Sequence, residues 1–253
     1  MAWFCDLDGV VWLAGHPLPG AAAAIERLRA AGERVVFVTN NSSATVAAQE
    51  ATLAAAGVPA EGDVITSAQA AALLLPPGST ALVCGGPGVD EALAARGVTV
   101  VATGDADAVV VGFTTAFDYE RLRVAHRAVW RGARLIGTND DPTYPTQEGP
   151  IPGGGALLAA VATAAGLAPT VAGKPYGPMA DLARTMVGPG DHTVVGDRPS
   201  TDGRFAVELG ARFALVMSGV TTPDDLPVDP TPDVVAADLA ALVDRVLAEA
   251  ADQ

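Results

Sequence analysis

The sequence predicts an α/β protein built on a doubly wound parallel sheet. Three observations support this class: short apolar runs alternate with helix-like stretches rich in Ala and Leu, several of these stretches end at a glycine, and polar clusters follow the apolar runs. Alternating strands and helices of this kind build a parallel sheet with helices on both faces. Ligands of such sheets bind beyond the carboxyl ends of the strands, which is where the polar clusters fall.

The elements follow one another in the order that such a sheet needs. Gly32, Gly57 and Gly210 each follow a helix-like stretch, which is a common way for helices to end. The expected strands are residues 2–5, 35–38, 192–195 and 212–216, and the expected helices are residues 21–31, 44–56, 201–209 and 234–248. Lys174 precedes a further helix that starts near Pro178.

A second domain is expected between the two halves of this sheet. The stretch from Thr39 to Lys174 is longer than the one or two further βα units, of roughly 30 residues each, that would complete the sheet. We predict a core of residues 1–76 and 171–253 and an inserted α/β domain of residues 77–170, with Pro/Gly-rich hinges at 76–78 and 169–175. Within the insert, strands are expected at residues 81–84, 98–101, 108–111 and 134–136, and helices at 89–95, 119–130 and 156–168.

Composition limits the partners and the location. Half of the 253 residues are apolar and the formal net charge is -14, which disfavours nucleic acids and anionic membranes. Cys5 and Cys84 lie far apart and form no C-x-x-C pair, so no disulfide framework is indicated. No stretch with the pattern of a secretion signal precedes Asp6. A cytoplasmic protein is therefore expected. The uncharged stretch between Glu148 and Lys174 holds an expected helix too short to span a membrane. The sequence leaves the oligomeric state open, a homo-oligomer included.

Two acids follow the first expected strand. Asp6 and Asp8 are two residues apart, so at a strand end their side chains point the same way, and Leu7 points into the core. Two carboxylates this close repel each other unless a cation lies between them, and Mg²⁺ commonly takes one or two carboxylates. The pair predicts a metal site, and an ordinary turn at Asp8-Gly9 is the alternative.

A polar segment, residues 39–43, follows the second expected strand and precedes a helix. Its hydroxyls, amides and backbone N–H groups suit a phosphate. Capping of the next helix by Ser42 or Ser43 explains the same residues. Lys174 lies between Gly173 and Pro175 after a long uncharged stretch, and a single lysine is ordinarily a solvated surface charge. Its importance rises only because it would converge on an acidic site.

A second pair of acids follows the expected strand at residues 192–195. Asp197 and Asp202 bracket a tight turn, so one can hold a metal while the other orients waters or Lys174 from behind. Helix capping by Ser200 or Thr201, with Asp202 in the favourable first turn, is the ordinary explanation. The two explanations are compatible.

Together these segments resemble the haloacid dehalogenase superfamily, and within it the branch of nitrophenylphosphatase, phosphoglycolate phosphatase and NagD-type proteins. The matching segments are residues 6–12, 38–43, 173–175 and 195–202, which span nearly the whole chain. Residues 137–141 and 153–157 look like the cap segment of that branch. The resemblance implies a Rossmann-like core with an inserted α/β cap of the C2 type, in agreement with the insert expected above.

The resemblance also implies a catalytic set. Asp6 would be the nucleophile and a Mg²⁺ ligand, and Asp8 the general acid/base, with its backbone carbonyl also on the metal. Asp197 would complete the protein ligands of the metal. An aspartate can attack phosphorus only where a metal and a cation reduce the repulsion between anions, which supports these roles.

Further roles are implied around this set. Thr39 and Asn40 would bind the phosphoryl oxygens, and Lys174 would neutralise their charge. Asp202 and Asn41 would orient these residues without touching the metal or the phosphate themselves. The candidates for substrate selection lie in the cap segment: Asn139, Asp140, Asp141 and Tyr144.

The predicted function is therefore a Mg²⁺-dependent phosphatase for small phosphomonoesters that works through an aspartyl phosphate. The substrate stays open among phosphoglycolate, glycerol phosphate, a sugar phosphate and a nucleotide monophosphate, with p-nitrophenyl phosphate turned over in vitro. An acid at position 8 favours a phosphatase, or a phosphomutase or phosphotransferase, over a dehalogenase, which needs no proton donor. A receiver-like signalling domain is smaller than this chain. A dinucleotide enzyme is disfavoured because Glu91 stands where the fingerprint that includes Gly86 and Gly88 needs glycine.

Overall fold

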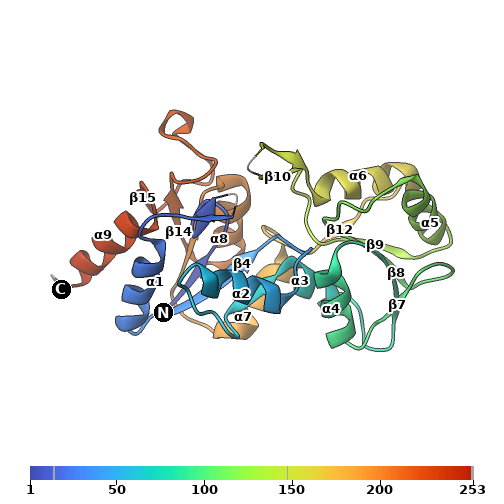
Figure 1. The fold of residues 1–253 in the computed structure, drawn as a ribbon, viewed down its shortest axis with the longest axis horizontal. Helices are drawn as coiled ribbons and strands as arrows, with labels where there is room; N and C mark the ends of the chain where they lie inside the picture. Colours follow the sequence, from blue (N-terminus) through green and yellow to red (C-terminus); the bar gives the residue numbers. More distant parts are fainter. Residues whose placement is uncertain (14, 147, 252–253) are drawn as a thin grey trace. The chain divides into compact units, whose positions relative to one another are not determined.

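The structure, a computed structural model, describes residues 1–13, 15–146 and 148–251. The chain forms two compact units (Figure 1). The first unit comprises Met1–Val38, Gln49–Ile65 and Ala180–Gln253, and the second comprises Thr39–Ala48 and Thr66–Met179. The predicted insert, residues 77–170, lies wholly within the second unit. The division into a core of residues 1–76 and 171–253 and a cap stays a prediction.

A six-stranded sheet forms the centre of the first unit, with the strand order β15-β14-β13-β1-β4-β5. β1 (Ala2–Cys5) lies between β13 (His192–Gly196) and β4 (Arg34–Thr39) and runs parallel to both. The other strands are β14 (Arg212–Val216), parallel to β13, β15 (Val234–Ala236), parallel to β14, and β5 (Val64–Thr66). The predicted doubly wound parallel sheet is confirmed.

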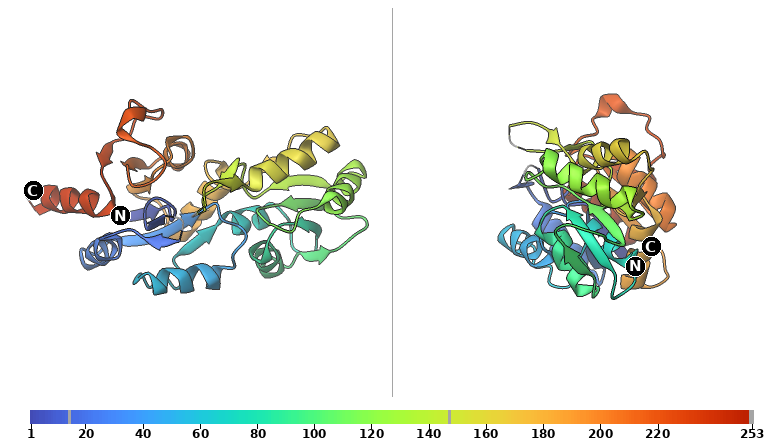
Figure 2. Two further views of the ribbon diagram at one scale, coloured as in Figure 1. Left: turned by 45° about the horizontal axis from the view of Figure 1, so that its top comes forward. Right: turned by 90° about the vertical axis from the view of Figure 1, so that its right-hand side faces the viewer.

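Helices cover this sheet because its central strands are apolar on both faces. Every residue of β1 and of β13 is buried, as in strands covered on both sides. Phe4 of β1 meets Phe205 of α8 (Arg204–Leu209) edge to face, with 6.5 Å between the ring centroids. α1 (Ala21–Ala30) packs beside α9 (Leu239–Ala251), as Figure 2 shows. The remaining helices that contribute to this unit are α2 (Val46–Ala55) and α7 (Gly177–Val187).

Two predicted helices begin later than expected because other structure precedes them. Residues 234–236 form the edge strand β15, because the β-branched Val234 and Val235 pair with β14, and α9 begins only at Leu239. Residues 199–203 form a π-helical turn, η1 (Pro199–Gly203), before α8 begins at Arg204. Turns of this kind are often found at functional sites.

The second unit has its own parallel sheet with the strand order β12-β9-β8-β6-β7. Its strands are β6 (Thr80–Cys84), β7 (Thr99–Val101), β8 (Ala108–Val111), β9 (Arg134–Gly137) and β12 (Thr170–Val171). Its helices are α3 (Ser67–Leu73), α4 (Pro87–Ala95), α5 (Tyr119–Trp130) and α6 (Gly154–Ala165). Two short antiparallel pairs complete the strands: β2 (Trp12–Leu13) with β3 (His16–Pro17) in the first unit, and β10 (Thr143–Tyr144) with β11 (Ile151–Pro152) in the second.

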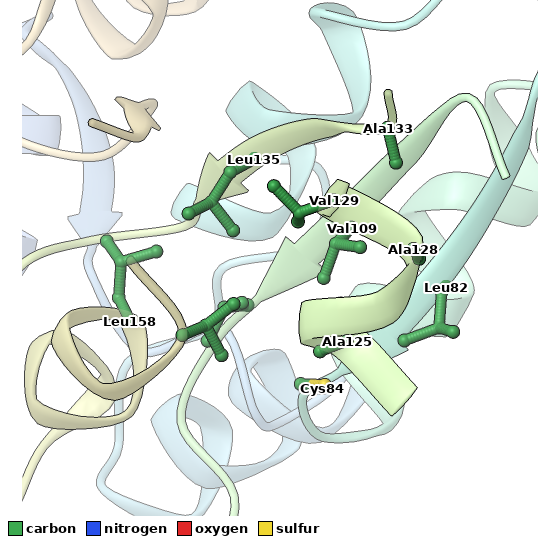
Figure 3. Close-up of a cluster of buried hydrophobic side chains, with 11 residues drawn as sticks. Leu82, Cys84, Val109, Ala125, Ala128, Val129, Ala133, Leu135 and Leu158 are labelled. Carbon is green, nitrogen blue, oxygen red and sulfur yellow. The ribbon is translucent and has the colours of Figure 1, made fainter. Parts of the chain in front are cut away.

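An apolar cluster fixes α5 and α6 on one face of this second sheet (Figure 3). Leu82 and Cys84 of β6 point toward Ala125 of α5, and Leu158 of α6 joins the same cluster. Because side chains alternate along a strand, Ala81 and Val83 face the opposite side, where α4 packs against β6 and β7. The unit is therefore a three-layer sandwich, which holds the loops at the carboxyl ends of its strands.

Within the part of the chain that the structure describes, no helix is long and apolar enough to cross a membrane. Cys5 and Cys84 carry free, buried thiols.

Candidate active site

Three carboxylates of the first unit converge beyond the carboxyl ends of β1 and β13. Asp6 follows β1, and Asp197 and Asp202 follow β13. Each offers an oxygen atom, and these oxygens all lie within 4.8 Å of one another. The parallel pairing of the two strands, with Cys5 beside Val195, brings the acids together, and the Asp6 N–H donates to the carbonyl of Val195 at 2.9 Å.

Glycines let the backbone close around Asp197. Gly9 has φ of +83°, a left-handed conformation that glycine adopts without strain, and a Cβ there would lie 2.6 Å from the Asp197 Cγ. A Cβ on Gly219 would lie 2.0 Å from the Asp197 Oδ2. Larger residues at either position would displace the carboxylate.

The loop after β14 fixes Asp197 by hydrogen bonds. The Val220 N–H donates to Asp197 Oδ2 at 2.5 Å, and the Thr221 hydroxyl donates to the Asp197 carbonyl at 2.5 Å. Ser218 donates to the carbonyl of Gly9 at 2.6 Å. This loop was not predicted from the sequence, although Ser218 and Gly219 closely follow the expected strand at residues 212–216.

The π-helical turn η1 carries Asp202 into the acidic group. Asp202 Oδ2 accepts from the Arg198 N–H at 3.1 Å, and the Asp202 N–H donates to the Arg198 carbonyl at 2.7 Å. Asp197 and Asp202 are 2% and 1% exposed. The sequence placed Asp202 behind the metal ligands, whereas the structure brings its carboxylate into the same group as Asp6 and Asp197.

Asp8 lies in the turn that follows β1. The carbonyl of Leu7 accepts from the N–H groups of Val10, Val11 and Trp12, which closes the turn. Leu7 is buried in the core, as predicted. Among the described acids, the group close enough to share an ion comprises Asp6, Asp197 and Asp202, without the Asp8 side chain. The metal roles assigned to Asp6, Asp8 and Asp197 stay predictions.

The thiol next to the nucleophile candidate is inert. Burial, and after it the negative charge of Asp6, raises the pKa of the Cys5 thiol to about 12. The thiolate is the nucleophilic form of cysteine. Cys5 is therefore not a competing nucleophile beside Asp6.

The other predicted site residues belong to the second unit. Among them, Asn40 and Lys174 are joined by hydrogen bonds. Lys174 is the single lysine of the sequence and is 2% exposed. The Lys174 N–H donates to Asn40 Oδ1 at 2.8 Å, and Asn40 Nδ2 donates back to the Lys174 carbonyl at 3.0 Å. The side chain of Asn40 thus holds both backbone groups of Lys174.

Asn40 also joins the segment that contains Asn139 and Asp141. Its Nδ2 donates to Asp141 Oδ2 at 3.0 Å, and its carbonyl accepts from Asn139 Nδ2 at 2.7 Å. The Ser67 hydroxyl donates to the same carbonyl at 2.8 Å. Ser67 was not predicted from the sequence, because neither β5, which it follows, nor α3, which it begins, was expected.

The remaining candidates are also hydrogen-bonded within the second unit. Asn41 Nδ2 donates to the Tyr144 hydroxyl at 3.2 Å, and the Tyr144 ring stacks on Phe113 with 4.7 Å between the centroids. The Tyr176 hydroxyl bonds to Asp140. Thr39, which is 3% exposed, accepts from the Asn41 N–H at 3.0 Å.

Two buried hydroxyls extend this network. The Thr138 hydroxyl donates to that of Ser42 at 2.9 Å, and both residues are fully buried. Ser42 was expected to bind phosphate or to cap a helix, and it does not cap α2, which begins at Val46. The segments 39–43, 138–144 and 173–176 are therefore tied together by side chains.

Two family models match most of this chain. A model described as haloacid dehalogenase-like hydrolase matches residues 3–99, and a second model, described as HAD-hydrolase-like, matches residues 171–242. These segments contain Asp6 and Asp8 at one end of the chain and Lys174, Asp197 and Asp202 at the other.

Named relatives are similar over most of the chain. A D-glycerol 3-phosphate phosphatase of Mycobacterium tuberculosis is 38% identical over 87% of this chain, which spans 64% of that protein. A glycerol-3-phosphate phosphatase of Gallus gallus is 36% identical over 87% of this chain and 80% of its own length.

Solved structures are similar to the same extent. A glycerol phosphate phosphatase from Mycobacterium tuberculosis in complex with magnesium superposes with a TM-score of 0.89 at 35% identity, over 95% of this chain and 75% of that one. A p-nitrophenyl phosphatase from Archaeoglobus fulgidus gives 0.89 at 30% identity, over 96% and 98%. The chain belongs to the haloacid dehalogenase-like hydrolases. Within that family its similarity is to phosphatases, which confirms the predicted enzyme class.

Proposed function

We propose that this protein is a Mg²⁺-dependent phosphatase that hydrolyses small phosphomonoesters through an aspartyl phosphate on Asp6. The observation that carries the proposal is the convergence of Asp6, Asp197 and Asp202 beyond the carboxyl ends of two neighbouring parallel strands. Ligands of open α/β sheets bind at such positions. The hydrolases of this family supply the chemical precedent.

The donor set fits Mg²⁺. All three groups offer carboxylate oxygens, the hard ligands that Mg²⁺ prefers, and the group contains neither His nor Cys. Asp197 and Asp202 are buried, and buried carboxylates that lie this close repel each other unless a cation compensates their charge. A bound ion would stabilise the negative charge that develops on the phosphoryl oxygens during the reaction. One of the solved structures similar to this chain contains magnesium.

The proposed chemistry takes place in two displacements. In the first, a carboxylate oxygen of Asp6 forms a bond to phosphorus, the bond from phosphorus to the ester oxygen breaks, and Asp8 donates its proton to the departing alkoxide. In the second, Asp8 takes a proton from a water molecule as the water oxygen bonds to phosphorus and the bond from phosphorus to the Asp6 oxygen breaks, which releases phosphate and restores both acids. Asp8 is half-buried in a tight turn, which suits a residue that exchanges protons with solvent.

The phosphoryl group is assigned to residues of the second unit. Thr39 and the backbone of Asn40 would donate hydrogen bonds to its oxygens, and the ammonium group of Lys174 would offset their charge. Burial of Lys174, which is 2% exposed, supports this role, because a charge kept out of bulk water acts more strongly on a bound phosphoryl group. The predicted cap of residues 77–170 would select among the substrates.

The substrate class follows from charge and from the relatives. With a net charge of -14 the protein repels polyanions at long range, so a small ester that carries one phosphate group is favoured over nucleic acid. The similar enzymes are named as glycerol phosphate phosphatases at 38% and 36% identity, as acid sugar phosphatases at up to 34% and as a p-nitrophenyl phosphatase at 30%. We therefore place glycerol phosphate first among the candidates, ahead of phosphoglycolate, sugar phosphates and nucleotide monophosphates. We keep the predicted cytoplasmic location, which the two free thiols favour.

A panel of metabolites tests the function. Phosphate release is measured for glycerol phosphate, phosphoglycolate, sugar phosphates, nucleotide monophosphates and p-nitrophenyl phosphate, with the wild type in Mg²⁺ and after metal removal. We expect Mg²⁺-dependent release from at least one metabolite and from p-nitrophenyl phosphate. Activity that is equal with and without metal, or no release from any ester, would contradict the proposal. Alcohol acceptors in the same assay reveal transfer of phosphate to an acceptor instead of water.

A further inference from the structure

We propose that Asn40 is a positioning residue for Lys174, and that Asp141 acts on the reaction through Asn40. The inference rests on the proposed function, because it assumes that Lys174 compensates the charge of the phosphoryl group. It differs from the roles predicted from the sequence, which had Asn40 bind phosphate directly and Asp141 select the substrate.

The contacts join residues that lie far apart in the chain. Asn40 and Lys174 are separated by 134 positions, yet the Asn40 side chain bonds both the N–H and the carbonyl of Lys174, at 2.8 and 3.0 Å. A pair of bonds to one residue fixes its backbone in both position and direction. The orientation of the Asn40 amide is set by its partners, since the N–H of Lys174 can only donate and its carbonyl can only accept.

The Asn40 side chain has no amide hydrogen left for a phosphate. An asparagine amide has two N–H hydrogens, and those of Asn40 are directed at the Lys174 carbonyl and at Asp141 Oδ2, at 3.0 Å each. Phosphate oxygens need donors. Direct binding by this side chain would therefore break a bond that the structure contains, whereas the backbone N–H of Asn40 is not involved in these contacts.

The backbone of Asn40 is also held by hydrogen bonds. Its carbonyl accepts from Ser67 and Asn139 at 2.8 and 2.7 Å. Gly173, which precedes Lys174, lies so close that a Cβ there would come within 2.5 Å of Asn40 Oδ1. Because both the backbone and the side chain of Asn40 are hydrogen-bonded, this residue can fix the position of Lys174, and catalysis requires such fixed positions.

Asp141 completes the arrangement. Its carboxylate accepts one Asn40 hydrogen, and its own N–H donates to Asn139 Oδ1 at 3.2 Å. A residue that acts in this way lowers turnover of every substrate by the same factor. A residue that touches the variable part of the substrate changes the ranking of substrates instead.

Nuclear magnetic resonance tests the structural half of the proposal without any catalysis. Since the sequence contains a single lysine, protein made with ¹³C-labelled lysine and free of added lysines gives one set of side-chain signals, all from Lys174. We expect Asn40→Ala to shift and broaden these signals in the protein without substrate. The matched control is Asn41→Ala, since the neighbouring amide bonds Tyr144 and Ser43 and should shift the Lys174 signals less. Equal spectra for wild type and folded Asn40→Ala would overturn the inference.

Kinetics tests the functional half. We expect Asn40→Ala to lower kcat/KM for p-nitrophenyl phosphate by about 10- to 100-fold, the loss typical of a misplaced catalytic group. In a Lys174→Ala background the same change should have little further effect, because the residue it positions is gone. Asn41→Ala should lose the same factor in both backgrounds. Full multiplication of the Asn40 and Lys174 losses would show that Asn40 acts independently of the lysine.

Asp141 variants separate positioning from substrate selection. Asp141→Asn keeps an oxygen that can accept from Asn40 and should retain most activity, whereas Asp141→Ala should lower kcat/KM by a similar factor for all active esters. A changed order of preference in Asp141→Ala would contradict the inference. Wild-type protein that hydrolyses no ester would contradict the proposed function instead, and the lysine spectra would still decide whether Asn40 positions Lys174.

Discussion

Gly219 lies against Asp197 so closely that a Cβ at position 219 would come within 2.0 Å of the carboxylate oxygen Oδ2. Two heavy atoms cannot approach that closely. Gly219→Ala must therefore move the carboxylate or the loop after β14. We expect a loss of stability of about 1–3 kcal/mol, typical of overpacking, and a raised Mg²⁺ requirement, measured by chemical unfolding and by activity against Mg²⁺ concentration.

Gly210→Ala is the matched control for that variant. Gly210 ends α8 with φ of +74° and has no atom within 4 Å of the Cβ position, so an alanine there strains the backbone without touching an acid. It should lower stability while the Mg²⁺ requirement stays that of the wild type. If both variants change the Mg²⁺ requirement equally, the effect comes from general destabilisation and not from Asp197.

Asp6→Asn should abolish activity and leave the fold intact. The amide has nearly the same shape as the carboxylate, but it is a poor nucleophile and a poor metal ligand. Turnover of p-nitrophenyl phosphate and the thermal unfolding midpoint are the two measurements. A folded variant that keeps more than about a tenth of the wild-type rate, which is about 1.4 kcal/mol of barrier, would exclude Asp6 as the nucleophile.

The structure predicts that Asp202 contributes to metal binding as strongly as Asp197. Their oxygens lie in one group with Asp6, so Asp202→Asn and Asp197→Asn should each weaken Mg²⁺ binding, and 10- to 100-fold is the order of magnitude expected even for a ligand-supporting group. Calorimetric titration of the metal-free protein with Mg²⁺ measures this directly. A variant at Asp202 with wild-type affinity would return that residue to the supporting role predicted from the sequence.

The buried thiols make the protein sensitive to alkaline pH. The pKa of Cys5 is raised to about 12 and that of Cys84 to about 11, in both cases mainly by burial. The folded state therefore keeps these protons longer than the unfolded chain, so their contribution to stability is complete below about pH 9 and is lost as the pH rises through the folded pKa. The slope is about 1.4 kcal/mol per pH unit for each thiol within that window.

Urea unfolding between pH 8 and 10.5 measures this slope, and Cys84→Ala should remove the share of that thiol. Native protein should also resist alkylation at pH 8.5 at both cysteines and react fully once it is unfolded. Rapid alkylation of Cys5 in the folded state would contradict the inert role assigned to it beside Asp6.

The sequence pattern predicted much of the architecture because apolar alternation and glycine placement are local signals. The strands at residues 2–5, 108–111 and 212–216 and the helix at 119–130 occur as expected. Residues 234–236 were assigned to a helix because Ala and Leu follow them directly. Their pairing with β14 joins residues 20 positions apart, such as Ala214 and Val234, and local propensity cannot report it.

In the candidate site, too, local signals could be predicted from the sequence and contacts between distant segments could not. Asp6, Asp197 and Asp202 were found because each follows an expected strand. The loop of Ser218 and Gly219 was missed, since its importance comes from an approach to Asp197 that no local pattern encodes. The partners of Asn40 were also out of reach, because a hydrogen bond between residues 40 and 174 leaves no trace in the spacing of either segment.

The strand order of the first sheet has a consequence for the way the chain folds. β1, made of residues 2–5, is completed by β13, which begins at residue 192. During synthesis the central strand therefore has one open edge until most of the polypeptide has emerged, and contacts between such distant segments form slowly. Asp6 acquires its acidic neighbours only at that late stage, so a truncated or nascent chain that ends before β13 lacks the partners that would let it capture an ion.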